Sequence, residues 1–273
     1  MAIDYIIEYD CLPQADLKPA GILERLKERA RAEEIIQWFR AAGDTREPNQ
    51  MGFDFTHSTP GVPGEKQLIV VQDLLDHAAV LGDYADYCAA CPANRARRPF
   101  GCAGFIQYPI SARAEIWLLE RLPVPDEPLI WLLLKQGIQK LGYDGSSVKA
   151  LRETDGGDGA AERTYFELPI APERRLGELR VSGDQVLEMI FGVGKRIIPN
   201  HAGILLLFLG AIERDLEARE IQAISSDGDS VRGRLAFDMA ADADADDCIR
   251  ELIAFVETLY IAWKLNVALY MDA

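Results

Sequence analysis

Hydrophobic and polar positions divide the chain into helices and short strands. Residues 3–9 alternate loosely and predict a strand that ends before Pro13. From about Ala20, apolar residues recur with a helical period, and Gly43 is placed to end that helix. The stretch 45–66 holds three Pro and three Gly residues and predicts a loop.

The middle of the chain continues this mixture up to a clear break. Residues 105–110 predict a strand, Ser111 is placed to cap a helix, and residues 129–141 predict a strongly apolar helix. The Gly- and Asp-rich run at 155–161 is typical of a linker. We therefore expect an N-terminal α+β domain over 1–154 and a helix-rich α+β domain over 162–273.

The C-terminal part is dominated by apolar helical patterns. Ser182 is placed to cap one helix, and Pro199 opens a second helix. A hairpin turning at 227–229 is expected next, followed by a long final helix over 246–270. Helices mixed with short, irregularly spaced strands predict the α+β class.

Composition and charge restrict the function classes. The 273 residues are 49% hydrophobic and 27% charged, as in a globular protein, and the formal net charge is −15. This charge disfavours binding to nucleic acids and to anionic membranes. The longest apolar run, 202–212, is too short to span a bilayer, and the N-terminus lacks a secretory pattern. With five clustered cysteines, we expect a cytoplasmic protein.

Three cysteines carry the strongest chemical signal. Cys88 and Cys91 are separated by two residues, so both sulfurs can reach one ion, and Cys102 follows a loop that contains Pro and Gly. Thiolates suit zinc and iron–sulfur clusters, because both favour sulfur ligands. A closed site needs a fourth ligand. The candidates for it are, in order, Cys11, His77 and Cys248.

The spacing favours structural zinc on Cys11, Cys88, Cys91 and Cys102. An iron–sulfur cluster is the alternative, since a proline follows Cys91, although the compact spacing of ferredoxin-like motifs is absent. A thiol–disulfide pair and simple buried thiols are weaker alternatives. The neighbouring arginines are expected to offset thiolate charge or to hold an anion. They are Arg95, Arg97 and Arg98.

Other motifs have plainer explanations. The acidic run 242–246 begins like a calcium loop but lacks its Gly and Glu, so it is better explained as the N-terminus of the last helix. Residues 192–195 lack the Ser or Thr of a phosphate loop and are typical of a helix end. His57 is expected to be a solvated loop residue rather than a base for Ser58.

These observations favour a metal-binding protein whose zinc site stabilises the fold. A metalloenzyme or redox protein using the same cysteines is the second hypothesis, although no catalytic residue can be selected among 44 carboxylates. An interaction protein with incidental cysteines is the third. The very apolar helices at 129–141, 202–212 and 249–270 are expected to pack in the core, form a homo-oligomer interface or line an apolar ligand pocket.

Overall fold

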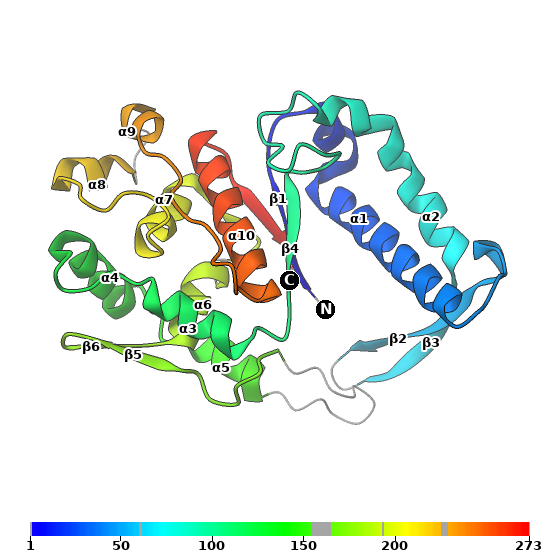
Figure 1. The fold of residues 1–273 in the computed structure, drawn as a ribbon, viewed down its shortest axis with the longest axis horizontal. Helices are drawn as coiled ribbons and strands as arrows, with labels where there is room; N and C mark the ends of the chain where they lie inside the picture. Colours follow the sequence, from blue (N-terminus) through cyan, green and yellow to red (C-terminus); the bar gives the residue numbers. More distant parts are fainter. Residues whose placement is uncertain (1, 60–61, 154–164, 193, 225–228, 273) are drawn as a thin grey trace. The chain divides into compact units, whose positions relative to one another are not determined.

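A computed structural model describes residues 2–59, 62–153, 165–192, 194–224 and 229–272. The chain forms two compact units, drawn in Figure 1. The sheet unit comprises Met1–Tyr9 and Cys102–Ala273, and the helical unit comprises Asp10–Gly101. These boundaries differ from the division expected from the sequence, whose linker at 155–161 lies outside the described residues.

An antiparallel sheet organises the sheet unit. Within the described residues, its strand order is β4-β1-β8-β7. Ile6 of β1 is opposite Ala103 of β4 and Tyr270 of β8, which makes β1 a central strand. Successive residues of β1 are fully buried, so both of its faces are covered. The strands are β1 (Ala2–Ile7), β4 (Ala103–Gln107), β7 (Arg196–Ile197) and β8 (Leu269–Asp272).

Helices supply most of the remaining core of this unit. The ring of Phe255, in the last helix, lies 5.1 Å from Tyr5 of β1 and 5.4 Å from Phe191. Trp263 of the same helix is fully buried. The strands β5 (Glu173–Leu176) and β6 (Leu179–Ser182) form a small antiparallel hairpin. The helices are α3 (Ala112–Glu120), α4 (Pro128–Lys140), α5 (Ser146–Glu153), α6 (Gly183–Phe191), α7 (Pro199–Phe208), α8 (Ala218–Ile224), α9 (Asp229–Arg234) and α10 (Asp247–Lys264).

Local capping sets two of these helix starts, as the sequence predicts. The Ser111 hydroxyl accepts a hydrogen bond from the Ala114 amide at the start of α3. Ser182 and Gln185 form a reciprocal capping box at the start of α6. Each cap satisfies amide groups that the first turn of a helix leaves without partners.

A buried ion cluster joins α3, α5 and α6. The Arg152 guanidinium donates to Asp184 over 2.6 Å and to Glu115 over 3.0 Å, with a second bond to the other Glu115 oxygen. The Arg152 and Glu115 side chains are 2% and 0% exposed. Arg152 also donates to the Leu168 carbonyl and lies over the ring of Phe166. Nearly every polar atom of the cluster is therefore paired inside the protein.

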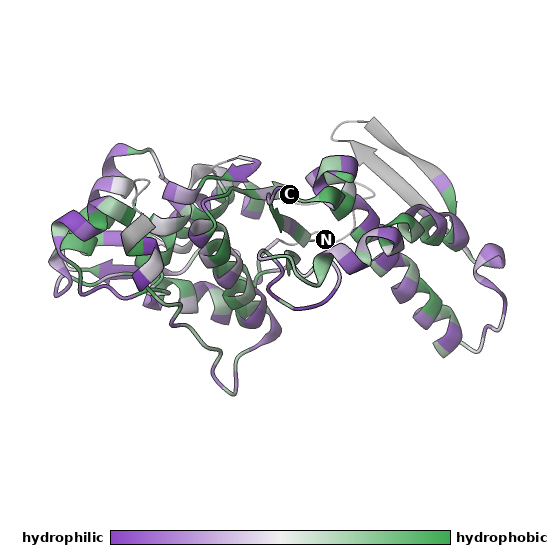
Figure 2. Ribbon diagram, turned by 90° about the horizontal axis from the view of Figure 1, so that it is seen from above, coloured by the Kyte–Doolittle hydropathy of each residue, from purple (hydrophilic) through white to green (hydrophobic). Residues whose placement is uncertain are grey.

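The helical unit contains α1 (Leu12–Ala41), a 3-10 turn η1 (Pro48–Gln50), β2 (Gly52–Thr59), β3 (Val62–Val70), α2 (Val71–Ala79) and a 3-10 segment η2 (Val80–Cys88). Helices α1 and α2 lie side by side and run in opposite directions (Figure 1). Hydrophilic and hydrophobic bands alternate along these helices (Figure 2), and the apolar side chains pack around Ala32, Met51, Val71 and Leu74.

Three sequence expectations are corrected here. The stretch 45–66 is not one loop, because it contains β2 and the first part of β3, which pair as an antiparallel hairpin. Where the strands of a hairpin were expected, the chain forms helices α8 and α9. Residues 227 and 228 of the expected turn lie outside the described ranges. The final helix ends at Lys264, after which Asn266 adopts a φ of 55° and β8 joins the sheet.

The α+β class is confirmed by this mixture of helices and strands. Along the described parts of the chain, no helix combines the length and apolar character needed to cross a membrane.

Candidate metal centre

The helical unit brings Cys11 near the end of η2, which carries Cys88. Cys11 is the residue before α1, and Cys88 is the last residue of η2. The Tyr84 hydroxyl of η2 donates a 3.0 Å hydrogen bond to Asp16, in the first turns of α1. This contact holds the start of α1 against η2, although 77 positions separate the two cysteines (88 − 11).

The pKa of the Cys11 thiol is raised above its usual value. Burial is the main cause that raises this pKa, and the backbone amide of Gln14 opposes the shift. Cys91 and Cys88 raise the pKa further, because a thiolate at Cys11 would be repelled by negative charge on either sulfur. Cys88 and Cys91 therefore both act electrostatically on the Cys11 thiol.

The segment after η2 folds into consecutive tight turns. The Cys91 amide donates to the Cys88 carbonyl, and the Asn94 amide donates to the Cys91 carbonyl. The Phe100 amide then donates to the Cys88 sulfur, with 3.3 Å between N and S. Amide donors of this kind stabilise negative charge on sulfur, as in the surroundings of many metal-bound thiolates.

Asn94 is the centre of this turn segment. Its side-chain amide donates to the Cys88 carbonyl over 2.7 Å. A side chain at Gly101 would place its Cβ 2.1 Å from the Asn94 oxygen, so only glycine fits there. Arg97 and Phe100 adopt φ values of 49° and 57°, which residues other than glycine seldom adopt. The segment keeps this strained backbone because its hydrogen bonds fix it.

The thiols are neighbours rather than a formed coordination shell. Among the described residues, no three His, Cys, Asp or Glu side chains stand in an arrangement that could already hold a metal ion. A zinc site on Cys11, Cys88, Cys91 and Cys102 therefore stays a prediction. So does the role of the nearby arginines, of which Arg97 and Arg98 are exposed and Arg95 is half-buried.

Cys102 and Cys248 belong to the sheet unit. Cys102 is buried, and its carbonyl accepts a hydrogen bond from Ile7 of β1. Cys248 lies in the first turn of α10, and burial raises the pKa of its thiol to about 11. This thiol is therefore protonated at neutral pH.

His77, the other candidate for the fourth ligand, is paired elsewhere. Its ring nitrogen is bonded to the Glu28 carboxylate of α1. Ten residues of helix, roughly 15 Å, separate Glu28 from the break in α1 at Lys18, and Cys11 lies beyond that break. His77 therefore ties α2 to the middle of α1 and does not join the thiols. His57 lies in β2, opposite Glu65, and not in a loop.

The acidic run 242–246 and the glycine-containing run 192–195 were both expected to be helix ends, and the structure confirms this. Asp246 caps α10 by accepting a hydrogen bond from the Ile249 amide, so the acidic run 242–246 leads into that helix. Gly192 follows the last residue of α6, which matches the helix end expected at 192–195.

The sheet unit contains a cavity of about 290 Å³. It lies between α4 and α7, two of the helices whose apolar pattern allowed a ligand pocket. Tyr143 and His201 also line it. No local motif marks Tyr143, whereas His201 follows Pro199 at a helix start, where a lowered pKa is expected; its pKa is lowered, and burial is the cause.

Comparison with protein-family models, with curated proteins and with solved structures finds no match to this chain. The candidate site is therefore argued from its own residues.

Proposed function

We propose that this protein binds a metal centre through the thiols of Cys11, Cys88 and Cys91, and that the metal fastens the start of α1 to the turns after η2. Zinc is the favoured metal, and an iron–sulfur cluster is the alternative that uses the same ligands. The observation that carries the proposal is the convergence of Cys11 with a Cys-x-x-Cys turn from a distant part of the sequence.

The surroundings of the sulfurs support metal binding. Cys11 stands at the N-terminus of a helix, where the Gln14 backbone amide lowers the pKa of its thiol against the larger, raising effect of burial. Cys88 receives an amide hydrogen bond, and the Asn94 side chain braces the same turn. Negative charge on Cys88 or Cys91 would repel a thiolate at Cys11, and a bound cation would remove that repulsion.

Closing the site requires the sulfurs to move together. In a tetrahedral zinc site with Zn–S bonds of about 2.3 Å, neighbouring sulfurs lie roughly 3.8 Å apart. Side-chain rotation at Cys11 and Cys91, which are both half-buried, is the expected way to reach that geometry. The sequence offers Cys102 as a fourth thiol, one residue beyond the helical unit. A fourth position filled by water would make the site catalytic instead.

The test is the metal content of the full-length chain, purified without added metal. About one equivalent of zinc in a colourless sample supports the structural site, whereas a brown sample containing iron and sulfide supports the cluster. A protein without metal, whose thiols also fail to take up added zinc, overturns the proposal.

Substitutions then assign the ligands. Cys88→Ser and Cys11→Ser are expected to lose most of the metal and to lower the melting temperature, because metal binding contributes to folding. Cys248→Ala is the matched control, since it removes a buried thiol of the sheet unit and should leave the metal content unchanged. Metal retained in Cys11→Ser, together with an exchangeable water ligand, would favour the catalytic form.

A further inference from the structure

We infer that the cavity between α4 and α7 binds a small, uncharged aromatic or aliphatic molecule that carries a hydroxyl group. The cavity belongs entirely to the sheet unit, so this inference does not rest on the metal centre.

The size of the cavity restricts its ligand. An apolar cavity of roughly 150 Å³ is known to hold benzene. A cavity of about 290 Å³ has nearly twice that volume, which suits a molecule the size of two fused aromatic rings. Leu141 lines the cavity and is 70% exposed, so it lies at the mouth and a ligand can enter past it.

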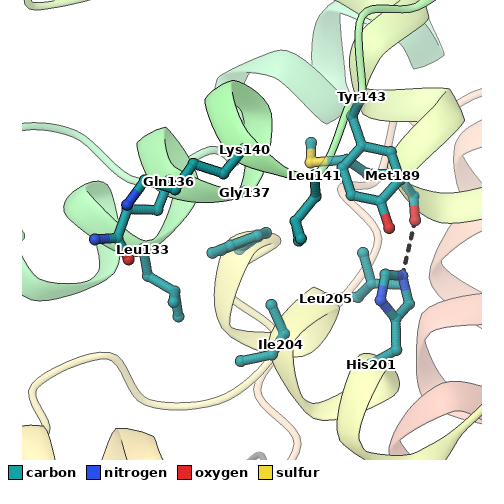
Figure 3. Close-up of a pocket in the computed structure, with 11 residues that line it drawn as sticks. Leu133, Gln136, Gly137, Lys140, Leu141, Tyr143, Met189, His201, Ile204 and Leu205 are labelled. Atoms are coloured by element: carbon teal, nitrogen blue, oxygen red, sulfur yellow. Dashed lines mark hydrogen bonds between the residues drawn. The ribbon is translucent and has the colours of Figure 1, made fainter.

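Most of the cavity wall is apolar. The side chains come from α4, α6, α7 and the segment after α4, and Figure 3 shows how they surround the space. A hydrophobic ligand body would replace water along this wall, which is the usual source of affinity in such pockets. The apolar lining residues are Leu133, Leu141, Met189, Ile204, Leu205 and Phe208.

Two polar groups lie together at one side of the cavity. Figure 3 shows the Tyr143 hydroxyl and the His201 ring on the same side, opposite Leu133. His201 Nε2 lies 2.9 Å from the Met189 carbonyl and must donate its proton there, which leaves Nδ1 as an acceptor. Within the described ranges, the Tyr143 hydroxyl has no hydrogen-bond partner among the protein groups. A donor and an acceptor side by side match one ligand hydroxyl, which both accepts and donates.

The charges near this pair disfavour an anionic ligand. Burial lowers the pKa of His201, so its ring is neutral at physiological pH. The negative charge of Glu188 acts on Tyr143, whose pKa is raised mainly by burial and further by that charge. Lys140 extends along α4 toward Gln136 and away from His201 (Figure 3). An uncharged hydroxyl therefore fits the site better than a carboxylate.

The test compares 2-naphthol, naphthalene and 2-naphthoate by equilibrium dialysis against the full-length chain. Saturable binding of 2-naphthol, about tenfold tighter than naphthalene, is expected from the hydrogen bonds to Tyr143 and His201. The carboxylate of 2-naphthoate should bind more weakly than 2-naphthol. Tighter binding of 2-naphthoate, or equal binding of naphthalene and 2-naphthol, would overturn the assignment.

Two variants separate the polar pair from the apolar cavity. Tyr143→Phe should weaken 2-naphthol binding about three- to tenfold and leave naphthalene binding unchanged. Leu133→Trp, at the partly exposed rim, should fill the space and weaken both ligands at least tenfold. Melting curves that match the unaltered protein show that each variant is folded. If neither variant changes binding, the ligands occupy another site and the inference fails.

Discussion

Removing the Arg152 guanidinium should expose how strongly the sheet unit depends on its buried ion cluster. Arg152→Met keeps much of the apolar stem and removes the charge. The Glu115 carboxylate, which is 0% exposed, would then lose both of its bonds to Arg152, and Asp184 would lose its 2.6 Å bond. Breaking a buried ion pair on one side costs about 3–5 kcal/mol, because the remaining charge is buried without compensation.

The assay is urea unfolding at about pH 7, with the stability taken from the transition midpoint and slope by linear extrapolation. The double variant Arg152→Met/Glu115→Gln is the control, since it removes the stranded charge as well. It should recover most of the lost stability, to within about 1–2 kcal/mol of the original protein. A loss below about 1 kcal/mol in the single variant would refute the reasoning.

The stability lost in Arg152→Met should also depend on pH. Burial raises the pKa of Glu115 in the folded protein, and the bonds to Arg152 oppose that shift. Without Arg152 the folded-state pKa rises further above the unfolded value of about 4.3. For a raised pKa, the stability contribution is complete below the unfolded pKa and is lost as pH rises through the folded pKa. The defect of Arg152→Met should therefore shrink at about pH 4 and be largest near pH 7.

Two further substitutions test local parts of the sheet unit. Ser111→Ala removes the cap of α3 and a 2.6 Å hydrogen bond to Asp246, so a loss of about 1–2 kcal/mol in urea unfolding is expected, and an unchanged midpoint would contradict it. Gly203→Ala would place a Cβ 2.8 Å from the Trp263 ring nitrogen, and thermal unfolding should show a loss of about 1–3 kcal/mol from this overpacking. Gly137→Ala is its control, because the added methyl meets no described atom within 4 Å and should stabilise α4 by about 0.5–1 kcal/mol.

Features set by neighbouring residues could be predicted from the sequence. Ser111 and Ser182 mark helix starts because a cap needs only an oxygen and an amide three residues later. The strand at 3–9 and the apolar helix at 129–141 follow from short periodic patterns, and the structure has β1 and α4 there. These elements depend on the spacing of residues close together in the sequence, so they can be read from the sequence alone.

Features set by distant pairing could not be predicted. The expected helix over 246–270 stops at Lys264, because the four residues of β8 pair with β1. The Gly- and Pro-rich stretch 45–66 was expected to be a loop, but pairing between β2 and β3 makes it part of a hairpin. Arg152 and Glu115 are 37 positions apart, and nothing in the sequence pairs them among so many charged residues. Long-range partners override local propensity in each case.

The candidate site divides in the same way. The two-residue spacing of Cys88 and Cys91 was visible in the sequence, and Cys11 was expected to join them because it also follows a strand. That Cys11 lies near them depends on the packing of α1 against η2, which the Tyr84 contact with Asp16 fixes. The geometry of a closed site depends on the metal itself and is absent from the sequence pattern.

X-ray absorption at the metal edge of the protein as purified tests the central claim most directly, because it counts the atoms bound to the metal. Coordination by Cys11, Cys88 and Cys91 predicts a shell of three or four sulfurs, at about 2.3 Å for zinc. That shell should disappear in Cys88→Ser and persist in Cys248→Ala. A shell of nitrogen and oxygen alone, or a sulfur shell unchanged in Cys88→Ser, would contradict the account.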